Sequence, residues 1–465
     1  MEKNQIVTAY VEGVTGGGEG VIRHEGVTFF VPACLTGEKV SFRVLKVKGS
    51  VGYGKIEEIF APSEDRVRPK CPVFAKCGGC VLQHLAYEKQ LELKGKTVQD
   101  ALRKIAGIDY PVPKAIASAK EYGYRNKLQL PIGVDKEGNT VLGFYAERSH
   151  RIIPIDGCEI HPEWSKKVVS AIKAYAVACR VSGYNEEDGT GVLRHIVVRE
   201  IGGKFLFTLV VAKEQVTGIS YLIDLLKKDF NEFSLYLNYH PENTNVIFGK
   251  RFELVHGAGV FEAEECGIRY EAGPQTFLQV NEGVRSKLYE RVVAETIESG
   301  DEVVIDAYSG GGLMTAMLAK KAKRAYGVEL EPEAVACADS LKEKNGLQNV
   351  QNVCAKTEDV LPALIEKEKK EKLRLVLDPP RAGLHRTVTD AVAKSGVERV
   401  TIVSCNPATL ARDLGLLTGA LVEKDGELIK ADGNSGAYRI EKLIPFDMFP
   451  QTKHVEVVAC LTRQK

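Results

Sequence analysis

The stretch Ser404-Cys405-Asn406-Pro407-Ala408-Thr409-Leu410 carries the strongest single indication of fold and chemistry in this chain. It follows the apolar run Val400-Thr401-Ile402-Val403, so we expect Cys405 to lie where a strand ends. Open α/β sheets bind ligands beyond the carboxyl ends of their strands, and a thiol placed there can act as a nucleophile. The alternative is a buried structural cysteine, which is the commoner fate of a free thiol.

Alternating strand and helix patterns surround this stretch. Strand patterns occupy residues 303–306, 324–328, 350–353, 373–377 and 399–403, and helix patterns begin at Leu313 and Pro332. This order predicts a parallel, doubly wound, Rossmann-like sheet. Residues 438–445 and 454–461 read as an antiparallel hairpin, which would make the sheet mixed.

The rest of the chain predicts two further domains. Residues 1–59 contain short alternating runs separated by glycine-rich turns, a pattern typical of a small oligonucleotide-binding (OB-like) β-barrel. Residues 60–273 mix helix and strand patterns, with a helix expected over about 87–106, and predict an α+β central domain. The expected division is therefore 1–59, 60–273 and a catalytic domain at 274–465.

Composition limits the possible classes of protein. The chain has 465 residues, 44% hydrophobic and 27% charged, as is ordinary for a globular protein. No apolar run approaches the roughly 18 residues of a membrane span, and no signal peptide is evident, so we expect a cytoplasmic protein with no membrane partner. Net charge is only +1, but residues 61–130 hold 13 Lys/Arg against 7 Asp/Glu, a local excess that suits a phosphate backbone.

Cysteine spacing predicts a metal site. Eleven cysteines in a chain of this kind disfavour a disulfide framework. Cys71, Cys77 and Cys80 are closely spaced, and Cys158 follows in a turn as a plausible fourth ligand. Four sulfurs suit zinc or an iron–sulfur cluster equally, and spacing alone does not choose between them.

Three further motifs carry residue types suited to cofactor binding or catalysis. Glycines at 310–312 follow a strand, and Glu329 ends the next strand, where a carboxylate can accept both hydroxyls of a ribose. This loop resembles the S-adenosylmethionine loop of Rossmann-type methyltransferases. Asp378-Pro379-Pro380 forms a rigid strand exit that would hold Asp378 between cofactor and substrate. Glu456 begins the last strand and is a candidate general base.

Taken together, these residues resemble the RNA 5-methyluridine methyltransferases, which methylate uracil C5 in ribosomal or transfer RNA, over essentially the whole chain. Residues 1–59 are similar to the TRAM barrel of that family, and residues 404–413 to its nucleophile signature. The resemblance implies Cys405 as nucleophile and Glu456 as base. It also implies a [4Fe–4S] cluster and binding of S-adenosylmethionine. The implied cluster ligands are Cys71, Cys77, Cys80 and Cys158; the implied cofactor-binding residues are Gln279, Tyr308, Gly310, Glu329 and Asp378.

The sequence departs from the family pattern in its glycine loop. Ser309 stands where a cysteine is usual, and Leu313 where a threonine or asparagine is usual. Leu313 cannot donate a side-chain hydrogen bond, so no cofactor contact is assigned to it.

The resemblance favours 23S ribosomal RNA as substrate, bound before full ribosome assembly by a monomeric enzyme. The alternatives are a transfer-RNA uracil-C5 methyltransferase and, in a different class, a non-catalytic iron–sulfur RNA-binding or electron-transfer protein. The latter leaves Cys405 and Glu456 unexplained. An RNA 5-methylcytosine methyltransferase would carry a cysteine inside the Asp-x-Pro turn, and Asp378-Pro379-Pro380 has none.

Overall fold

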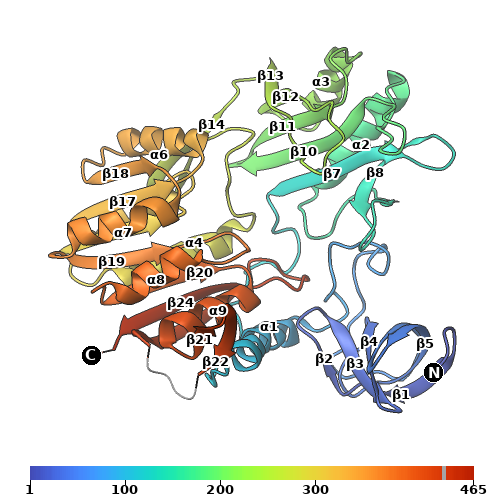
Figure 1. The fold of residues 1–465 in the computed structure, drawn as a ribbon. Helices are drawn as coiled ribbons and strands as arrows, with labels where there is room; N and C mark the ends of the chain where they lie inside the picture. The colour runs from blue at the N-terminus through green and yellow to red at the C-terminus, as the bar shows by residue number, and fades with distance from the viewer. Residues whose placement is uncertain (432–435, 465) are drawn as a thin grey trace.

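The computed structural model describes residues 1–431 and 436–464, which form three large β-sheets and two two-stranded ones along the chain (Figure 1). The first is a six-stranded half-barrel of strand order β1-β5-β6-β4-β3-β2. Its interior is filled by apolar side chains that include Phe29 and Phe42, whose ring centroids lie 5.0 Å apart. The expected N-terminal OB-like barrel is confirmed in this form. Its strands are β1 (Ile6–Tyr10), β2 (Gly13–Val14), β3 (Glu19–His24), β4 (Val27–Pro32), β5 (Lys39–Lys48) and β6 (Val51–Ala61).

The second sheet has seven strands in the order β13-β12-β11-β10-β7-β8-β9. Helices α2 (Trp164–Ala178) and α3 (Ile219–Lys227) pack on one face and enclose a core of aliphatic and aromatic residues. This arrangement is the expected α+β layer. The strands are β7 (Lys127–Val134), β8 (Thr140–Tyr145), β9 (Ile152–Pro154), β10 (Leu193–Ile201), β11 (Lys204–Val211), β12 (Phe233–Tyr239) and β13 (Arg251–His256).

The third sheet, of order β18-β17-β16-β19-β20-β24-β23, is parallel through β20 and antiparallel at β24 and β23. This is the expected mixed Rossmann-like sheet with its terminal hairpin. The parallel strands are buried on both faces, so their sequences are almost continuously apolar rather than alternating. The strands are β16 (Glu302–Ala307), β17 (Arg324–Glu329), β18 (Val350–Cys354), β19 (Lys372–Leu377), β20 (Arg399–Ser404), β23 (Tyr438–Phe446) and β24 (Glu456–Arg463).

Helices cover both faces of the third sheet. One layer packs with residues of α7 (Thr357–Glu368), α8 (Arg386–Lys394) and α9 (Pro407–Thr418). The opposite layer packs with α4 (Glu282–Thr296), α5 (Leu313–Ala319) and α6 (Pro332–Lys344). Two small hairpins complete the fold: β14 (Phe261–Glu265) with β15 (Ile268–Ala272), and β21 (Leu421–Lys424) with β22 (Glu427–Lys430). No described helix is long and apolar enough to cross a membrane.

Helix α1 (Tyr87–Ala101) joins distant parts of the sequence. It continues as a π-helical turn, η1 (Leu102–Ala106), and the buried side chains of Val98, Leu102 and Ala106 belong to the core beneath the third sheet. Figure 1 shows α1 beside α9, between the half-barrel and the C-terminal region. The helix precedes the second sheet in sequence but packs with the third, so it fastens the segments on either side of it to the C-terminal sheet.

A buried ion pair strengthens this junction. The Lys94 ammonium contacts the Asp447 carboxylate, and both side chains are almost completely excluded from solvent. Lys94 also donates to the Phe449 carbonyl at 3.0 Å, and Oδ2 of Asp447 has no hydrogen-bond partner among the described residues. Asp447 therefore depends on Lys94 for its charge compensation.

Replacing Lys94 by methionine should lower the thermal unfolding midpoint by several degrees, because breaking a buried pair by removing one partner costs about 3–5 kcal/mol. The double replacement Lys94→Met with Asp447→Asn should recover part of this loss, since no buried charge remains. Scanning calorimetry of both variants measures the effect. A single variant that unfolds at the wild-type temperature would contradict it.

Candidate active site

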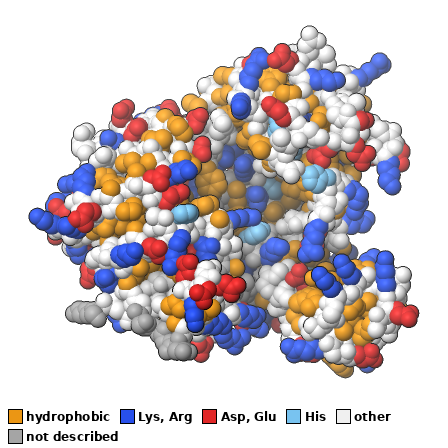
Figure 2. All heavy atoms as spheres, in the orientation of Figure 1, with side chains coloured by type: hydrophobic (Ala, Val, Ile, Leu, Met, Phe, Trp, Pro, Cys, Tyr) orange, Lys and Arg blue, Asp and Glu red, His pale blue; other side chains and the backbone are white. Residues whose placement is uncertain are grey.

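One large cavity lies between the second sheet and the carboxyl ends of the third sheet's parallel strands. Figure 2 shows the corresponding hollow in the middle of the molecule, with Lys, Arg and His side chains along its walls. Its volume is about 1720 Å³. Pockets for one small ligand measure about 300–1,000 Å³, so this cavity has room for a cofactor and a substrate group together. All the residues predicted for catalysis, cofactor binding and metal ligation line it: Cys405, Glu456, Gln279, Tyr308, Gly310, Glu329, Asp378, Cys71, Cys77, Cys80 and Cys158.

The loop after β16 is shaped to admit a ligand. Tyr308 has a left-handed backbone with φ of 65°, a conformation that non-glycine residues adopt rarely and mostly at functional sites. A Cβ added at Gly310 or Gly311 would meet no atom within 4 Å, so open space lies above both residues. The Gly310 amide donates to the Glu329 carboxylate at 2.9 Å. Tyr308, Gly310 and Glu329 therefore lie together in one cradle at the strand ends.

Asp306 lies in β16, two residues before Tyr308. Its side chain is buried, and Thr315 Oγ1 donates to it at 2.5 Å. Burial raises the pKa of Asp306 to about 7, with smaller contributions from Asp378 and Glu329. The position of Asp306 near the end of a buried strand, next to the glycine loop, is a sequence signal that could have indicated it.

Cys405 follows β20 directly, at the strand end where it was expected. Asn406 fixes the loop in two ways: its side chain caps α9 by accepting from the Ala408 amide at 3.1 Å, and it donates to the Arg381 carbonyl at 3.0 Å. Thr409 Oγ1 donates to the same carbonyl at 3.3 Å. The polar residues around Cys405 thus tie the thiol to the Asp-Pro-Pro turn.

A second set of contacts fixes the far end of that turn. Asp413 accepts from the Leu384 amide at 2.8 Å and from the Arg412 guanidinium at 2.6 Å. Gly383 has φ of 79°, and a Cβ there would lie 2.5 Å from Arg412 and 2.7 Å from Asp413. Residues 404–413 therefore hold both ends of the segment from Arg381 to Leu384, which follows Asp378 in the chain.

The side chains beside the thiol form a coupled electrostatic group. Glu456 is 4% exposed, and burial followed by the nearby Asp378 raises the pKa of Glu456 to about 8. Burial, followed by the charge of Glu456, also raises the pKa of Cys405, while Arg381 lowers it by charge and by a side-chain hydrogen bond. Asp378 is open to the cavity yet surrounded by protein, which raises its pKa to about 7. Arg381 is thus the cation that favours the ionised forms of both Cys405 and Glu456.

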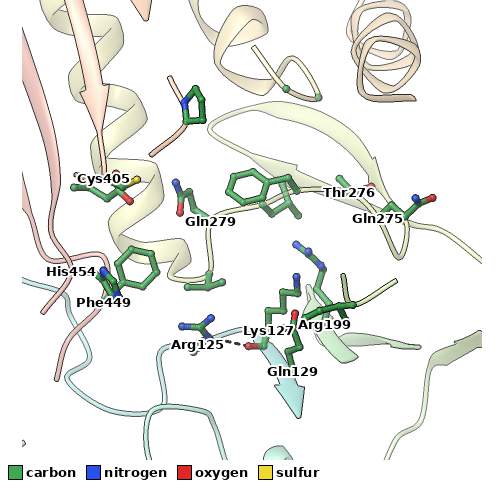
Figure 3. Close-up of a pocket in the computed structure, with 18 of the residues that line it drawn as sticks. Arg125, Lys127, Gln129, Arg199, Gln275, Thr276, Gln279, Cys405, Phe449 and His454 are labelled. Atoms are coloured by element: carbon green, nitrogen blue, oxygen red, sulfur yellow. Dashed lines mark hydrogen bonds between the residues drawn. The ribbon is translucent and has the colours of Figure 1, made fainter. Parts of the chain in front are cut away.

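Other side chains complete the surroundings of the thiol. Figure 3 shows Cys405, Phe449 and His454 on one side of the cavity, with Gln279 reaching between them and the opposite wall. Phe277 is 75% exposed within the cavity lining, an unusual position for a large apolar ring. Burial followed by Arg381 lowers the pKa of His454 to about 4, so this imidazole is neutral near pH 7. Sequence patterns assign no role at the thiol to Phe277, Phe449 or Arg381, because their positions beside it depend on the tertiary fold.

The four predicted ligand cysteines gather on the wall of the second sheet. All are free thiols. Burial is the main cause that raises the pKa of Cys80 and of Cys158, and the charges of the other cysteines raise both further. Cys71 donates its amide to Gln83 at 3.1 Å, and Cys77 Sγ accepts from the Gly79 amide at 3.4 Å. Within residues 1–431 and 436–464, no group of three or more candidate ligands is spaced to hold a single metal ion.

Arg66 does not join a phosphate-binding surface, although it lies in the basic segment 61–130. Its guanidinium donates to the buried Glu38 carboxylate, at 2.5 and 2.8 Å, and to the Ala33 carbonyl at 2.7 Å. It therefore joins the half-barrel to the segment that follows. The excess of Lys and Arg in residues 61–130 identified a basic region. It could not show which of these cations are paired with carboxylates inside the fold and which are available to a phosphate.

Comparison with known proteins places these features in a family. Residues 258–464 match the family model described as tRNA (Uracil-5-)-methyltransferase. A protein of Clostridium tetani named as an RNA methyltransferase is 37% identical over 99% of this chain and 97% of its own length. Another of that name, from Halalkalibacterium halodurans, is 37% identical over 99% of this chain and 98% of its own length.

A solved structure is similar to the whole fold. The tRNA (uracil-54, C5)-methyltransferase of Pyrococcus abyssi, in complex with S-adenosyl-L-homocysteine, superposes with a TM-score of 0.76 at 27% identity. The match covers 98% of this chain and 99% of that one. With full-length relatives above 30% identity and a catalytic-region match, the chain belongs to the RNA uracil-5-methyltransferase family.

Proposed function

We propose that this protein methylates uracil C5 in RNA with S-adenosylmethionine as methyl donor, through Cys405 as nucleophile and Glu456 as base. The observation that carries the proposal is the shared cavity in which a strand-end thiol lies within the electrostatic influence of a buried carboxyl group. The cradle formed by Tyr308, Gly310 and Glu329 opens on the same cavity and suits an adenosyl cofactor. S-adenosylmethionine supplies an electrophilic methyl group when bound.

The chemistry explains why a thiol and a base are both needed. Uracil C5 is too weak a nucleophile to accept a methyl group directly. The Cys405 thiolate adds to C6, which forms a carbon–sulfur bond and moves an electron pair toward C5 and O4. C5 then takes the methyl group. Glu456 removes the remaining proton from C5, and the electron pair released expels the Cys405 thiolate and restores the ring.

The neighbouring charges adapt the site to these steps. Arg381 offsets the negative charge of the thiolate before addition, because it lowers the pKa of Cys405. A pKa of about 8 makes Glu456 a stronger base than an ordinary carboxylate once it is ionised. Asp378 faces the cavity beside Glu456, where it can hydrogen-bond the edge of the uracil. Gln279 contributes to the cofactor side.

For the substrate we propose 23S ribosomal RNA, methylated by a cytoplasmic, monomeric enzyme before ribosome assembly is complete. Transfer RNA is the second candidate, and one observation favours it: the Pyrococcus abyssi enzyme is named for a tRNA uridine, and its whole chain matches this one, the N-terminal half-barrel included. The presence of a half-barrel therefore does not argue against transfer RNA. Methylation assays on separate 23S rRNA and tRNA transcripts, with labelled S-adenosylmethionine, distinguish the two.

We further propose that residues 1–59 act as a TRAM-type RNA-binding domain and residues 60–273 as a central RNA-binding domain beside the catalytic domain 274–465. Cys71, Cys77, Cys80 and Cys158 would hold a [4Fe–4S] cluster. The support for this proposal is that all four are free thiols lining one cavity, and that, after burial, the charges of Cys71 and Cys77 raise the pKa of both Cys80 and Cys158. The cluster would hold the cysteine loop in one conformation, and methyl transfer is polar and needs no electron from it.

Cys405→Ala should abolish methyl transfer while leaving S-adenosylmethionine affinity within about twofold of wild type, because the thiol forms the bond to C6 but lies outside the cofactor cradle. Cofactor binding by calorimetry and methylation of rRNA transcripts test this. Substantial turnover in the variant would overturn the nucleophile, and RNA binding without turnover in the wild type would favour a non-catalytic protein.

Glu456→Gln should accumulate a covalent protein–RNA adduct, because addition and methylation proceed while elimination stalls without the base. The adduct should appear as a slower band on denaturing gels after incubation with S-adenosylmethionine and RNA, and should be missing in Cys405→Ala. A variant that turns over normally and traps no adduct would exclude this role.

The same variant reports on the buried carboxyl. Because the folded pKa of Glu456 is raised from 4.5 to about 8, the folded state binds the extra proton over that range and wild-type stability falls as pH rises through it. Glu456→Gln lacks this group, so its melting temperature relative to wild type should be higher at pH 8 than at pH 5. An equal difference at both pH values would show an ordinary carboxyl group.

Anaerobically purified protein should be brown and contain about four irons per chain. Cys77→Ser should lose colour and iron together, whereas Cys354→Ser, which removes an exposed thiol at the end of β18, should keep both. Absorption spectra and metal analysis decide the matter. Stoichiometric zinc without iron would refute the cluster.

A further inference from the structure

The face of the second sheet that lines the cavity carries an unusual group of positive charges. On β7 and β10, alternate residues point to the α2 and α3 core, and the residues between them face the cavity. Lys127 and Arg199 are direct partners across the two antiparallel strands, and both line the cavity. Figure 3 shows their side chains close together with Gln129 and Arg125, across the cavity from Cys405.

These cations lack compensating carboxylates. Within the described residues, none of Arg125, Lys127 and Arg199 forms an ion pair, whereas most buried cations of this protein do, as Lys94 and Arg285 illustrate. Arg125 Nε donates only to the Lys127 carbonyl, at 3.2 Å. The nearest carboxylate in sequence, Glu200, is occupied on the other face by the Trp164 indole, at 2.7 Å.

Arg199 carries the clearest sign of a missing partner. The residue is 4% exposed, and its buried Nη1 has no acceptor in the described structure. Like charges directly opposite on paired strands repel, and an unsatisfied buried donor destabilises the folded state. Burial, followed by the charges of Arg199 and Arg125, lowers the pKa of Lys127 to about 8. An anion placed between these paired cations would supply both the missing acceptor and the missing opposite charge.

We propose that Lys127 and Arg199, with Arg125, form a phosphate subsite that binds the RNA backbone next to the nucleotide presented to Cys405. This inference rests on the proposed function and extends it to a named wall of the cavity. A base that enters the catalytic pocket leaves its flanking phosphates outside, and the opposite wall offers them a guanidinium, an ammonium and the Gln129 amide. The cofactor cradle lies on a different wall, built from the ends of β16 and β17.

The test compares Lys127→Gln and Arg199→Gln with the matched control Lys370→Gln, which removes an exposed, unpaired lysine beyond the end of α7. The probe is a fluorescein-labelled oligouridylate, titrated at several salt concentrations. Lys127→Gln and Arg199→Gln should each bind the oligouridylate at least about tenfold more weakly than wild type at low salt. Each should also flatten the plot of log binding constant against log salt by about 0.7 per lost contact. The control should match wild type.

Two further measurements separate a binding site from a structural element. Removing one of two opposed cations should leave the melting temperature unchanged or raise it, and should leave S-adenosylmethionine affinity unchanged. With an oligouridylate whose linkages are neutral methylphosphonates, wild type and variants should bind alike. The subsite would be overturned if both Lys127→Gln and Arg199→Gln kept the wild-type salt slope. It would also be overturned if they melted at lower temperatures with unchanged slopes, or if they lost affinity for S-adenosylmethionine. Methylation in Cys405→Ala would instead overturn the proposed function and leave the binding result standing.

Discussion

The low-dielectric surroundings of three carboxyl groups at the strand ends are the constraint on which this site depends. Asp306 lies next to the last residue of β16, Asp378 follows β19 and Glu456 begins β24, and the surrounding protein raises the pKa of each carboxyl to about 7 or 8. Three such groups around one cavity repel one another when ionised, so the site favours their protonated forms until a ligand or Arg381 compensates the charge. Hydrogen bonds of Asn406 and Asp413 hold the segment that follows Asp378 against the residues around the thiol despite that cost.

The opposite wall of the cavity also holds charged groups away from bulk water, but these groups are positive. Positive charges on β7 and β10 face the cavity without partners, while the reverse face of those strands is apolar and packed. Stability for the whole arrangement comes from elsewhere, from the cores on both faces of the third sheet and from the α1 junction with its Lys94–Asp447 pair. An acidic wall for the reacting base and a basic wall for its backbone would together orient a nucleic acid in the cleft.

The sequence predicted the fold well because its signals are local. The strand-then-helix order, the run before Cys405 and the glycine turns of the first sixty residues depend on near neighbours, and each appears in the structure. The packing of helix α1 against α9 was not predicted, because it joins segments about three hundred residues apart. The pairing of Arg66 with Glu38 and the isolation of Arg199 were hidden for the same reason. Alternation of polar residues along 127–131 was the one available hint that a sheet face was kept for a ligand.

The most direct test of the central claim uses RNA in which 5-fluorouridine replaces uridine. Fluorine replaces the C5 proton, and a base cannot remove it. Attack by the thiol and methyl transfer should therefore be followed by no elimination, and a stable covalent complex should remain. Mass spectrometry of the digested complex, formed with S-adenosylmethionine, should place a methylated fluoronucleotide on the peptide that contains Cys405 and on no other cysteine peptide. Attachment at another cysteine, or full methyl-transfer activity on normal RNA with no covalent complex on the fluorinated one, would contradict the account.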